Sequence, residues 1–275
     1  MKIIRHASTI GAEIHDVDLV QVTDDELLAL QWALLEHKVI FFRDQTLDDE
    51  THQALAARWG EPVAHPVQAL LGLEQAVGVV FNDAEHPPGD GDGWHTDHSW
   101  ADYVPDVAIL RAVEVPPVGG DTLWSDVAAA HDALSAPMRR MLSGLTARHD
   151  PGPRFALEMR VRMGDEMASR VTEAFPGEDH PVVAAHPVTG RPGIFVNPGY
   201  TRSINGVTAA ESEALLSLLF AHVGRADFVA RWRWEPGSVA IWDEHATLHR
   251  GPIDFAPATR ELRRFTVGRH TPTSV

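Results

Sequence analysis

The sequence predicts a mainly β fold, a sandwich or jelly roll with flanking helices, rather than a parallel α/β sheet. From Trp94 onward, short β-type segments recur, and turns rich in glycine and proline separate them. Two of these turns are Val118–Asp121 (VGGD) and Glu235–Ser238 (EPGS). The chain has 275 residues, with no internal repeat and no low-complexity linker, so we expect residues 1–275 to form a single domain.

The N-terminal third alternates predicted helices and strands. Apolar residues recur at helical spacing in Asp24–His37, which leads into the short apolar strand Lys38–Phe42. A second helix is predicted over Asp48–Trp59, and a strand follows near Ala76–Phe81. The segment Pro87–Gly93 (PPGDGDG) is predicted to be a mobile loop, because glycine and proline disfavour regular structure.

Two helical segments interrupt the later β-type segments. Residues Pro153–Pro181 form a polar, partly helical insertion of a kind that could cover the mouth of a barrel. A longer helix is predicted over Ala209–His222, where Thr208 is a plausible cap and Glu211 stands three residues further on.

Composition excludes several classes of function. Aspartate and glutamate total 39 against 23 lysines and arginines, and the resulting charge of −16 argues against nucleic acid as a partner. With no cysteine, the chain has no disulfides, thiolate metal sites or cysteine nucleophiles. Met1–Ile14 lacks a signal-peptide core, and no apolar run is long enough to span a membrane. We therefore expect a soluble cytoplasmic protein.

The segment Gly93–His98 (GWHTDH) contains a candidate pair of metal ligands. On a strand, alternate side chains share a face, so His95 and Asp97 would point together. An isolated His-X-Asp is weak support, since it is more often a surface or hydrogen-bonded pair. A distant histidine would complete a triad of two histidines and one carboxylate, which leaves three metal positions open.

His249 is the candidate for that third ligand. His245 and His249 stand four residues apart, as in a zinc-protease helix, but Ala246 occupies the position where that motif requires glutamate. A Pro-Gly turn and the predicted strand Val239–Trp242 also precede them. We therefore reject the protease interpretation.

Together these segments resemble the taurine dioxygenase (TauD/TfdA) family of iron(II)- and 2-oxoglutarate-dependent oxygenases. The resemblance extends over nearly the whole chain. It implies a double-stranded β-helix (jelly-roll, cupin-like) core, iron(II), 2-oxoglutarate and O2 as co-substrates, and a homo-oligomer. The matched blocks, in order, are Ile10–Ile14, His37–Gln45, Trp94–Asp97, Gly119–Thr122, Phe195–Asn197, Ala209–His222, Arg231–Trp234, Ile241–Asp243 and His249 with the arginine-rich tail.

Carried over residue by residue, the resemblance assigns iron and its co-substrate. His95, Asp97 and His249 correspond to the iron ligands. Thr122 and Arg260 correspond to the residues that contact the distal carboxylate of 2-oxoglutarate. A guanidinium group suits a carboxylate because it donates two parallel hydrogen bonds.

The resemblance also implies a substrate pocket. Arg264 corresponds to the arginine that binds the substrate sulfonate, and His65 to a histidine beside it. Phe155 and Tyr200 correspond to aromatic residues that line the pocket. For His65 and the two aromatic residues, the alternative is an ordinary place in the core.

Strand geometry supports the two arginines independently. In the segment Thr259–Val267, the side chains of Arg260 and Arg264 fall on the same face. Two inward-facing arginines beside a dication are costly unless anions neutralise them. The alternative is a pair of solvated surface arginines.

Two positions depart from the taurine pattern. Gln68 stands where the taurine enzymes carry a tyrosine, and Gly91 stands where they carry an asparagine. We therefore expect a small anionic substrate other than taurine, namely another sulfonate, a sulfate ester or a carboxylate. The predicted reaction is its hydroxylation, with release of succinate and CO2. The alternatives are a metal-dependent hydrolase and a non-catalytic metal-binding jelly roll, neither of which needs the pair Thr122 and Arg260.

Overall fold

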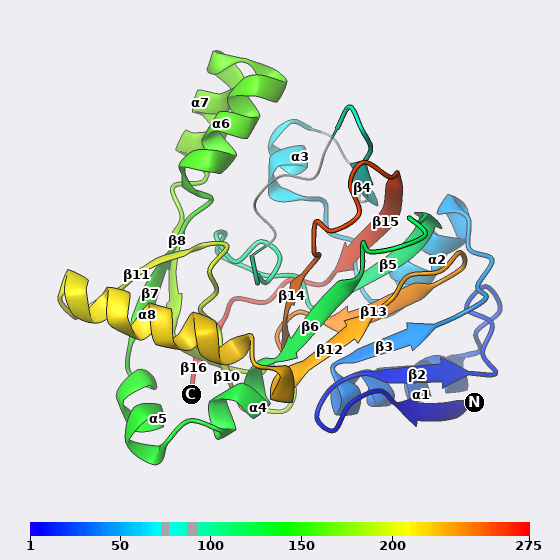
Figure 1. Ribbon diagram of the computed structural model, residues 1–275, viewed down its shortest axis with the longest axis horizontal. Helices are drawn as coiled ribbons and strands as arrows, with labels where there is room; N and C mark the ends of the chain where they lie inside the picture. The colour runs from blue at the N-terminus through cyan, green and yellow to red at the C-terminus, as the bar shows by residue number, and fades with distance from the viewer. Residues whose placement is uncertain (73–76, 87–92) are drawn as a thin grey trace.

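The computed structural model describes residues 1–72, 77–86 and 93–275. Ala76, Gly91 and residues 87–92 of the predicted loop lie outside the described residues. The largest element of the described part is a seven-stranded sheet (Figure 1). In order across the sheet, its strands are β1 (Lys2–Arg5), β2 (Ala12–His15), β3 (Val39–Phe42), β13 (Val239–Asp243), β5 (Val107–Glu114), β15 (Arg260–Val267) and β4 (Val77–Asn82). Neighbouring strands are antiparallel except β2 and β3, which are parallel.

Three smaller sheets complete the β structure of the described residues. The first contains β12 (Val229–Trp232), β6 (Thr122–Asp126) and β14 (Thr247–Arg250). The second contains β11 (Thr201–Ile204), β7 (Thr146–His149) and β8 (Glu178–Pro181). The third contains β10 (Pro192–Ile194), β9 (Val183–Ala185) and β16 (Thr273–Ser274).

The sheet of β12, β6 and β14 faces the large sheet across an aromatic core. Phe41 of β3 stacks on Trp232 of β12 with ring centroids 4.3 Å apart. Trp124 of β6 meets Trp242 of β13 edge to face at 5.6 Å. All four side chains are buried, and aromatic burial of this kind contributes strongly to stability. The protein is therefore sheet-rich, with helices on the outside.

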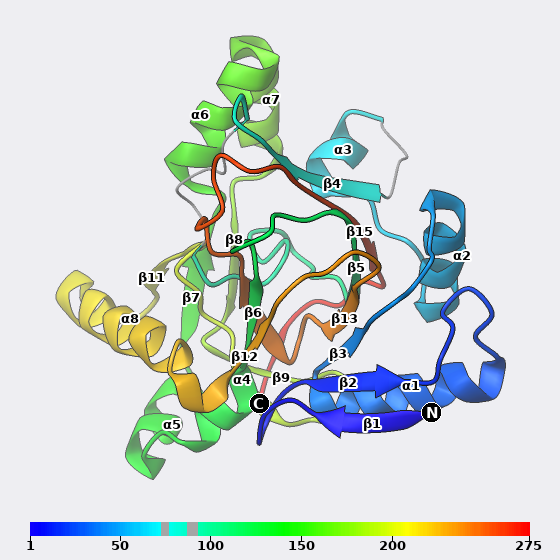
Figure 2. The ribbon, with the colours of Figure 1, turned by 45° about the vertical axis from the view of Figure 1, so that its right-hand side comes forward.

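Helices α1 (Asp24–His37) and α2 (Asp49–Trp59) pack against the opposite face of the large sheet (Figure 2). Leu30 of α1 and Leu55 of α2 enter a core cluster with Ile40 of β3 and Ile241 of β13. Because β3 is covered on both faces, all four of its side chains are buried.

Side-chain caps fix the starts of these helices, although neither cap was predicted from the sequence, and α2 starts at Asp49, one residue later than expected. Thr23 and Glu26 form a capping box at α1, and Asp48 forms one at α2. The predicted start of the following strand was one residue too early. Lys38 ends α1 in the left-handed conformation, with a φ of 65°, and β3 begins at Val39.

A second core lies under α8 (Ala209–Val223), where Thr208 caps the helix as predicted. The helix ends one residue later than expected. Short helices complete this side of the molecule: α4 (Val127–Asp132), α5 (Ala136–Leu142) and η1 (Ala226–Phe228). No helix in the described ranges is long and apolar enough to cross a membrane.

The predicted insertion consists of α6 (Gly152–Met163) and α7 (Asp165–Ala174), followed by β8. In Figures 1 and 2 the two helices project away from the sheets. At its base, Val171 of α7 clusters with Trp100 and with Val67 of the short helix α3 (Pro66–Leu70). The insertion therefore packs on the segment that follows Asp97.

Candidate active site

Main-chain pairing brings His95 and His249 together. The two residues form an isolated antiparallel bridge, in which each backbone N–H donates to the other residue's carbonyl, at 3.0 and 2.8 Å. Their rings lie side by side, with centroids 4.2 Å apart. Two imidazoles that are distant in sequence are thus fixed next to each other by the backbone.

The predicted strand through Asp97 was wrong. Within residues 93–100, only His95 takes part in β pairing. The chain turns over 97–100, and His98 adopts the left-handed conformation with a φ of 58°. The turn is closed by the N–H of Ala101, which donates to the carbonyl of His98 at 2.8 Å. Packing of Trp100 into the α3–α7 cluster draws the chain away from an extended path. The turn still directs Asp97 toward both histidines.

Side-chain atoms of His95, Asp97 and His249 converge as metal ligands would. One ligand atom from each lies within 4.8 Å of the others. Oδ1 of Asp97 is 3.7 Å from Nε2 of His95 and 3.8 Å from Nε2 of His249. Nδ1 of His95 lies 3.0 Å from the carbonyl of Gly93, a position that places its hydrogen there and leaves the Nε2 lone pair for a metal. The donor set fits a divalent iron ion.

Electrostatics keep these ligands in metal-binding forms. Burial would raise the pKa of Asp97, but the charge of Arg264, with His249 and His95, holds it below its usual value. Burial lowers the pKa of His249 well below its usual value, so its imidazole is neutral. Arg264 donates from Nη1 to Oδ2 of Asp97 over 2.6 Å.

A buried glutamate behind the triad was not anticipated from the sequence. Glu244 accepts the N–H of Asp97 at Oε2 (3.1 Å) and the Nε1–H of Trp242 at Oε1 (2.8 Å). Burial and the charge of Asp97 raise the pKa of Glu244. Glu244 lies in the turn between β13 and β14, a few residues before His249, and nothing in the local sequence marks it.

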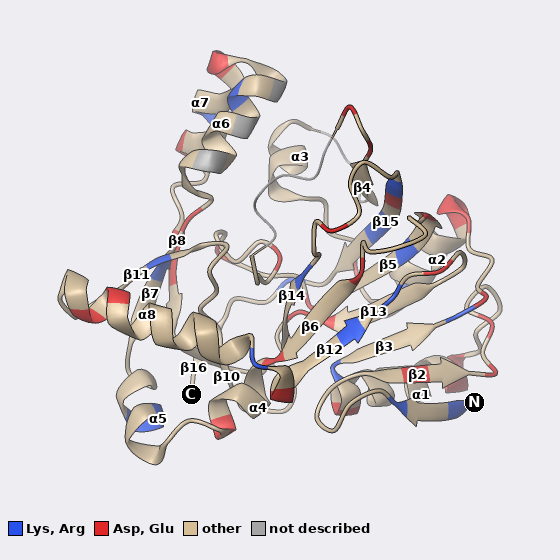
Figure 3. Ribbon diagram, viewed as in Figure 1, with Lys and Arg blue, Asp and Glu red and all other residues tan. Residues whose placement is uncertain are grey.

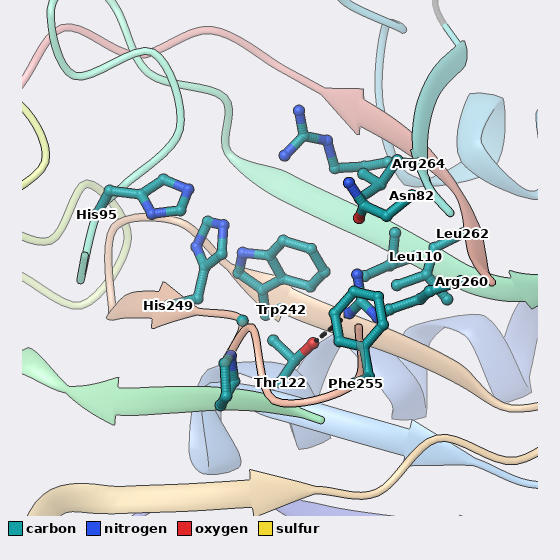
Figure 4. A pocket seen from close by; sticks show the side chains of 13 residues that line it. Asn82, His95, Leu110, Thr122, Trp242, His249, Phe255, Arg260, Leu262 and Arg264 are labelled. Atoms are coloured by element: carbon teal, nitrogen blue, oxygen red, sulfur yellow. Dashed lines mark hydrogen bonds between the residues drawn. The ribbon is translucent and has the colours of Figure 1, made fainter. Parts of the chain in front are cut away.

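A cavity of about 240 Å³ opens beside the triad (Figure 4). Arg260 lies away from the histidines, donating to the carbonyl of Gly120 at 2.9 Å and to Oγ1 of Thr122 at 3.3 Å. Gly120 has a φ of 69°, and a Cβ there would lie 3.1 Å from Cδ of Arg260, so glycine makes room for this arginine. The lining residues are Val80, Asn82, His95, Leu110, Thr122, Trp242, His249, Gly251, Pro252, Phe255, Arg260, Leu262 and Arg264.

The alternation predicted for β15 is confirmed. Arg260, Leu262 and Arg264 all line the cavity. Arg263 instead pairs with Glu261. In Figure 3 the ribbon of β15 carries blue segments, which mark basic residues, although the chain is strongly acidic overall. Among the lining residues, Asn82 and Trp242 were not singled out from sequence, because only the fold brings β4 and β13 to this cavity.

His65 and Tyr200 stand near the triad. His65 caps α3, where its Nδ1 accepts the N–H of Val67 at 3.2 Å, so the neutral ring carries its hydrogen on Nε2. Burial, with the charge of Arg264, lowers the pKa of His65 to about 4. The ring of Tyr200 lies edge to face against His95 at 5.9 Å, and burial raises its pKa to about 12.

Gln68 and Phe155 lie further from the candidate metal ligands. Gln68 is half-buried in α3 and does not line the cavity beside the triad. Phe155 packs on Trp100 at 5.8 Å and lines a separate cavity of about 310 Å³ between α6 and α7. The structure therefore gathers most, but not all, of the predicted site residues.

The fold and the site together define a class of enzyme. A sheet-rich protein with two histidines and a carboxylate converging beside a cavity, with a buried arginine in its wall, has the features of a non-haem iron(II) oxygenase. A family model described as "Taurine catabolism dioxygenase TauD, TfdA family" matches residues 3–266. The chain belongs to this family of dioxygenases.

Individual relatives agree with this membership. An α-ketoglutarate-dependent sulfate ester dioxygenase from Pseudomonas putida is 36% identical over 98% of this chain and 90% of its own length. An alkylsulfatase from Acinetobacter baylyi is 32% identical, covering 96% of this chain and 84% of its own. The crystal structure of a taurine dioxygenase from Burkholderia xenovorans superposes with a TM-score of 0.82 at 36% identity, covering 99% of this chain and 92% of that one.

Proposed function

We propose that this protein is an iron(II)- and 2-oxoglutarate-dependent dioxygenase that hydroxylates a small organic anion, with iron held by His95, Asp97 and His249. We further propose that residues 1–275 form one domain with a double-stranded β-helix core. The two sheets that face each other across the aromatic core support that topology. Self-association and a cytoplasmic location stay predictions.

One observation carries the proposal: a single cavity is lined both by metal ligands and by a buried arginine–threonine pair. 2-Oxoglutarate has an anionic group at each end. Arg260 and Thr122 would bind its distal carboxylate, while its keto acid end would reach the positions that the three protein ligands leave open. A hydrolase would have no use for this second anion site.

The protein residues supply binding, orientation and exclusion of water. When bound, iron(II) and 2-oxoglutarate supply the oxidising chemistry that hydroxylates an unactivated carbon. Leu110, Trp242 and Phe255 line the cavity and would shield the aliphatic part of a bound co-substrate from water. Arg260 is buried, so it would offset the negative charge of the distal carboxylate in a setting where burial strengthens their interaction.

We propose a sulfate ester as the substrate class, with its anionic head beside Arg264 and His65. A guanidinium has five N–H donors, so Arg264 can contact Asp97 and an anion together. The neutral ring of His65 would donate from Nε2. The sulfate ester dioxygenase and the alkylsulfatase among the relatives support this class.

The proposed reaction divides the two atoms of O2 between the co-substrate and the substrate. One oxygen atom of O2 enters succinate as 2-oxoglutarate loses CO2, and the other hydroxylates the carbon that bears the sulfate group. The hydroxylated ester then breaks its C–O bond to sulfate. The products are an aldehyde, hydrogen sulfate, succinate and CO2.

The test is an anaerobic titration of the iron(II) protein with 2-oxoglutarate. A dioxygenase site gives a visible metal-to-ligand charge-transfer band, because the keto acid chelates iron. A metal-dependent hydrolase or a non-catalytic metal-binding protein would give no such band. Alkyl sulfates should then stimulate succinate release in air, and failure to form the band would reject the proposal.

A further inference from the structure

Glu244 is an acidic residue in direct contact with the proposed metal ligands without being one of them. Its side chain is fully buried, although burial of a carboxylate is costly unless donors compensate it. Oε2 accepts the N–H of Asp97, and Oε1 accepts the Nε1–H of Trp242. The donors hold the carboxylate in a single orientation.

The same carboxylate faces the second imidazole of the site. Nδ1 of His249 is buried and has no hydrogen-bond partner among the described residues. Oε2 of Glu244 lies 4.0 Å from that atom, beyond hydrogen-bond length but within reach of a small movement. His95 already has the corresponding partner, since its Nδ1 lies 3.0 Å from the carbonyl of Gly93.

A metal-bound imidazole normally donates its other N–H to an acceptor, which fixes its tautomer and orientation. His249 can bind a metal through Nε2 only when Nδ1 carries the hydrogen. The acceptor must then lie on the Nδ1 side, where the carboxylate of Glu244 is found. The imidazole ring also packs against Trp242, with centroids 5.0 Å apart, and Trp242 itself donates to Glu244.

We propose that Glu244 is a positioning residue for the metal centre. It orients Asp97 through that residue's backbone N–H, and it accepts the Nδ1–H of His249 when a metal binds. This inference rests on the proposed function only in taking Asp97 and His249 as metal ligands. The role requires acceptors on both oxygens, because Trp242 Nε1–H and the Asp97 N–H can only donate.

The test compares two isosteric substitutions in the same turn. Glu244→Gln replaces one acceptor oxygen with an NH2 group that opposes N–H donors. Asp243→Asn is the matched control, since Asp243 is also buried but contacts His186 and the N–H groups of the turn. The probe is cobalt(II) added alone to the metal-free protein, followed by its visible d–d absorption.

We expect Glu244→Gln to weaken cobalt(II) binding by roughly 10- to 100-fold, the range found for outer partners of metal ligands, and to change the d–d spectrum. Both variants should lower the thermal midpoint to a similar extent. Asp243→Asn, however, should leave cobalt(II) affinity within about twofold of wild type, a change well below that range. If Glu244→Gln keeps wild-type affinity and spectrum, the inference is wrong.

Two further experiments distinguish failure of the metal assignment from failure of the role of Glu244. His249→Ala and Asp97→Ala must lose cobalt(II) binding, and if they retain it, the metal assignment fails rather than the role of Glu244. If Glu244→Gln does not fold, the wild-type cobalt(II) protein still provides a test by proton NMR. It should show two strongly shifted imidazole N–H signals that exchange slowly with water, from His95 and His249, and a single slowly exchanging signal would overturn the inference.

Discussion

Arg264 and Asp97 form a short ion pair, in which Nη1 lies 2.6 Å from Oδ2. The other carboxylate oxygen, Oδ1, faces His95 and His249. Asp97 therefore directs one oxygen toward the metal position and the other toward the arginine that we expect to bind the substrate. An anion bound beside Arg264 would share its guanidinium with a proposed metal ligand, so we expect substrate binding and the metal centre to be linked electrostatically.

Arg264→Gln should raise the concentration of alkyl sulfate needed for half-maximal succinate release by roughly ten- to a hundredfold, because a hydrogen bond to a charged group contributes about 1.5–3 kcal/mol. The iron–2-oxoglutarate absorption band should remain. Arg263→Gln is the matched control, since Arg263 lies on the same strand and pairs with Glu261. If neutral alcohols stimulate turnover as well as sulfates do, or taurine proves the best stimulant, the substrate proposal is wrong.

Replacement of His95, Asp97 or His249 by alanine should abolish iron-dependent succinate formation. The fold should survive, because the hydrophobic core clusters of the described residues contain none of the three. Circular dichroism and the thermal midpoint check the fold, and succinate is measured with freshly added iron(II). Wild-type turnover in any one of the three would remove that residue from the ligand set.

Arg260→Ala should strongly raise the apparent requirement for 2-oxoglutarate. Loss of one partner from a buried charge pair costs about 2–5 kcal/mol, and Arg260 is buried. Thr122→Val should have a smaller effect, since it removes one hydroxyl that also accepts from Trp234. The dependence of succinate release on 2-oxoglutarate measures both effects, and an unchanged value in Arg260→Ala would mean that another residue binds the co-substrate.

Because of His52, we expect the free energy of unfolding to decrease in mild acid. Burial, with the charge of Arg111, lowers its pKa to about 4 in the folded state. Between about pH 6.5 and about pH 4 the unfolded chain binds a proton there that the folded chain does not, so stability falls as pH falls. The free energy of unfolding should therefore decrease between about pH 7 and about pH 5, and this decrease should be about 2 kcal/mol smaller in His52→Leu than in the wild type. Urea unfolding at both pH values measures this, and identical losses in both proteins would contradict it.

The sequence alone predicted elements whose determinants are local. Thr208, with Glu211 three residues on, correctly marked the start of α8, and alternation along β15 correctly placed Arg260 and Arg264 in one cavity. Lys38 was misplaced because apolar neighbours mask a left-handed helix end.

What could not be predicted depends on contacts between distant segments. The turn at Asp97 forms because Trp100 packs against Val67 and Val171, which come from two separate helices. Glu244 gained significance only when the fold brought it to the backbone of Asp97. Glutamate in a turn carries no local sign of such a contact.

Two of the residues that we expect to face the substrate, His65 and Phe155, stand on helical segments, apart from the proposed metal ligands. The proposed ligands, the co-substrate pair and Arg264 belong to the β bridge, the turn that follows it, and β6, β14 and β15. His65, by contrast, caps α3, and Phe155 belongs to α6, and both pack around Trp100. Selectivity can therefore diverge by exchange of helical segments while the oxidative machinery stays intact. A chimaera that grafts residues 152–176 from a relative onto this scaffold is the natural route to new specificities.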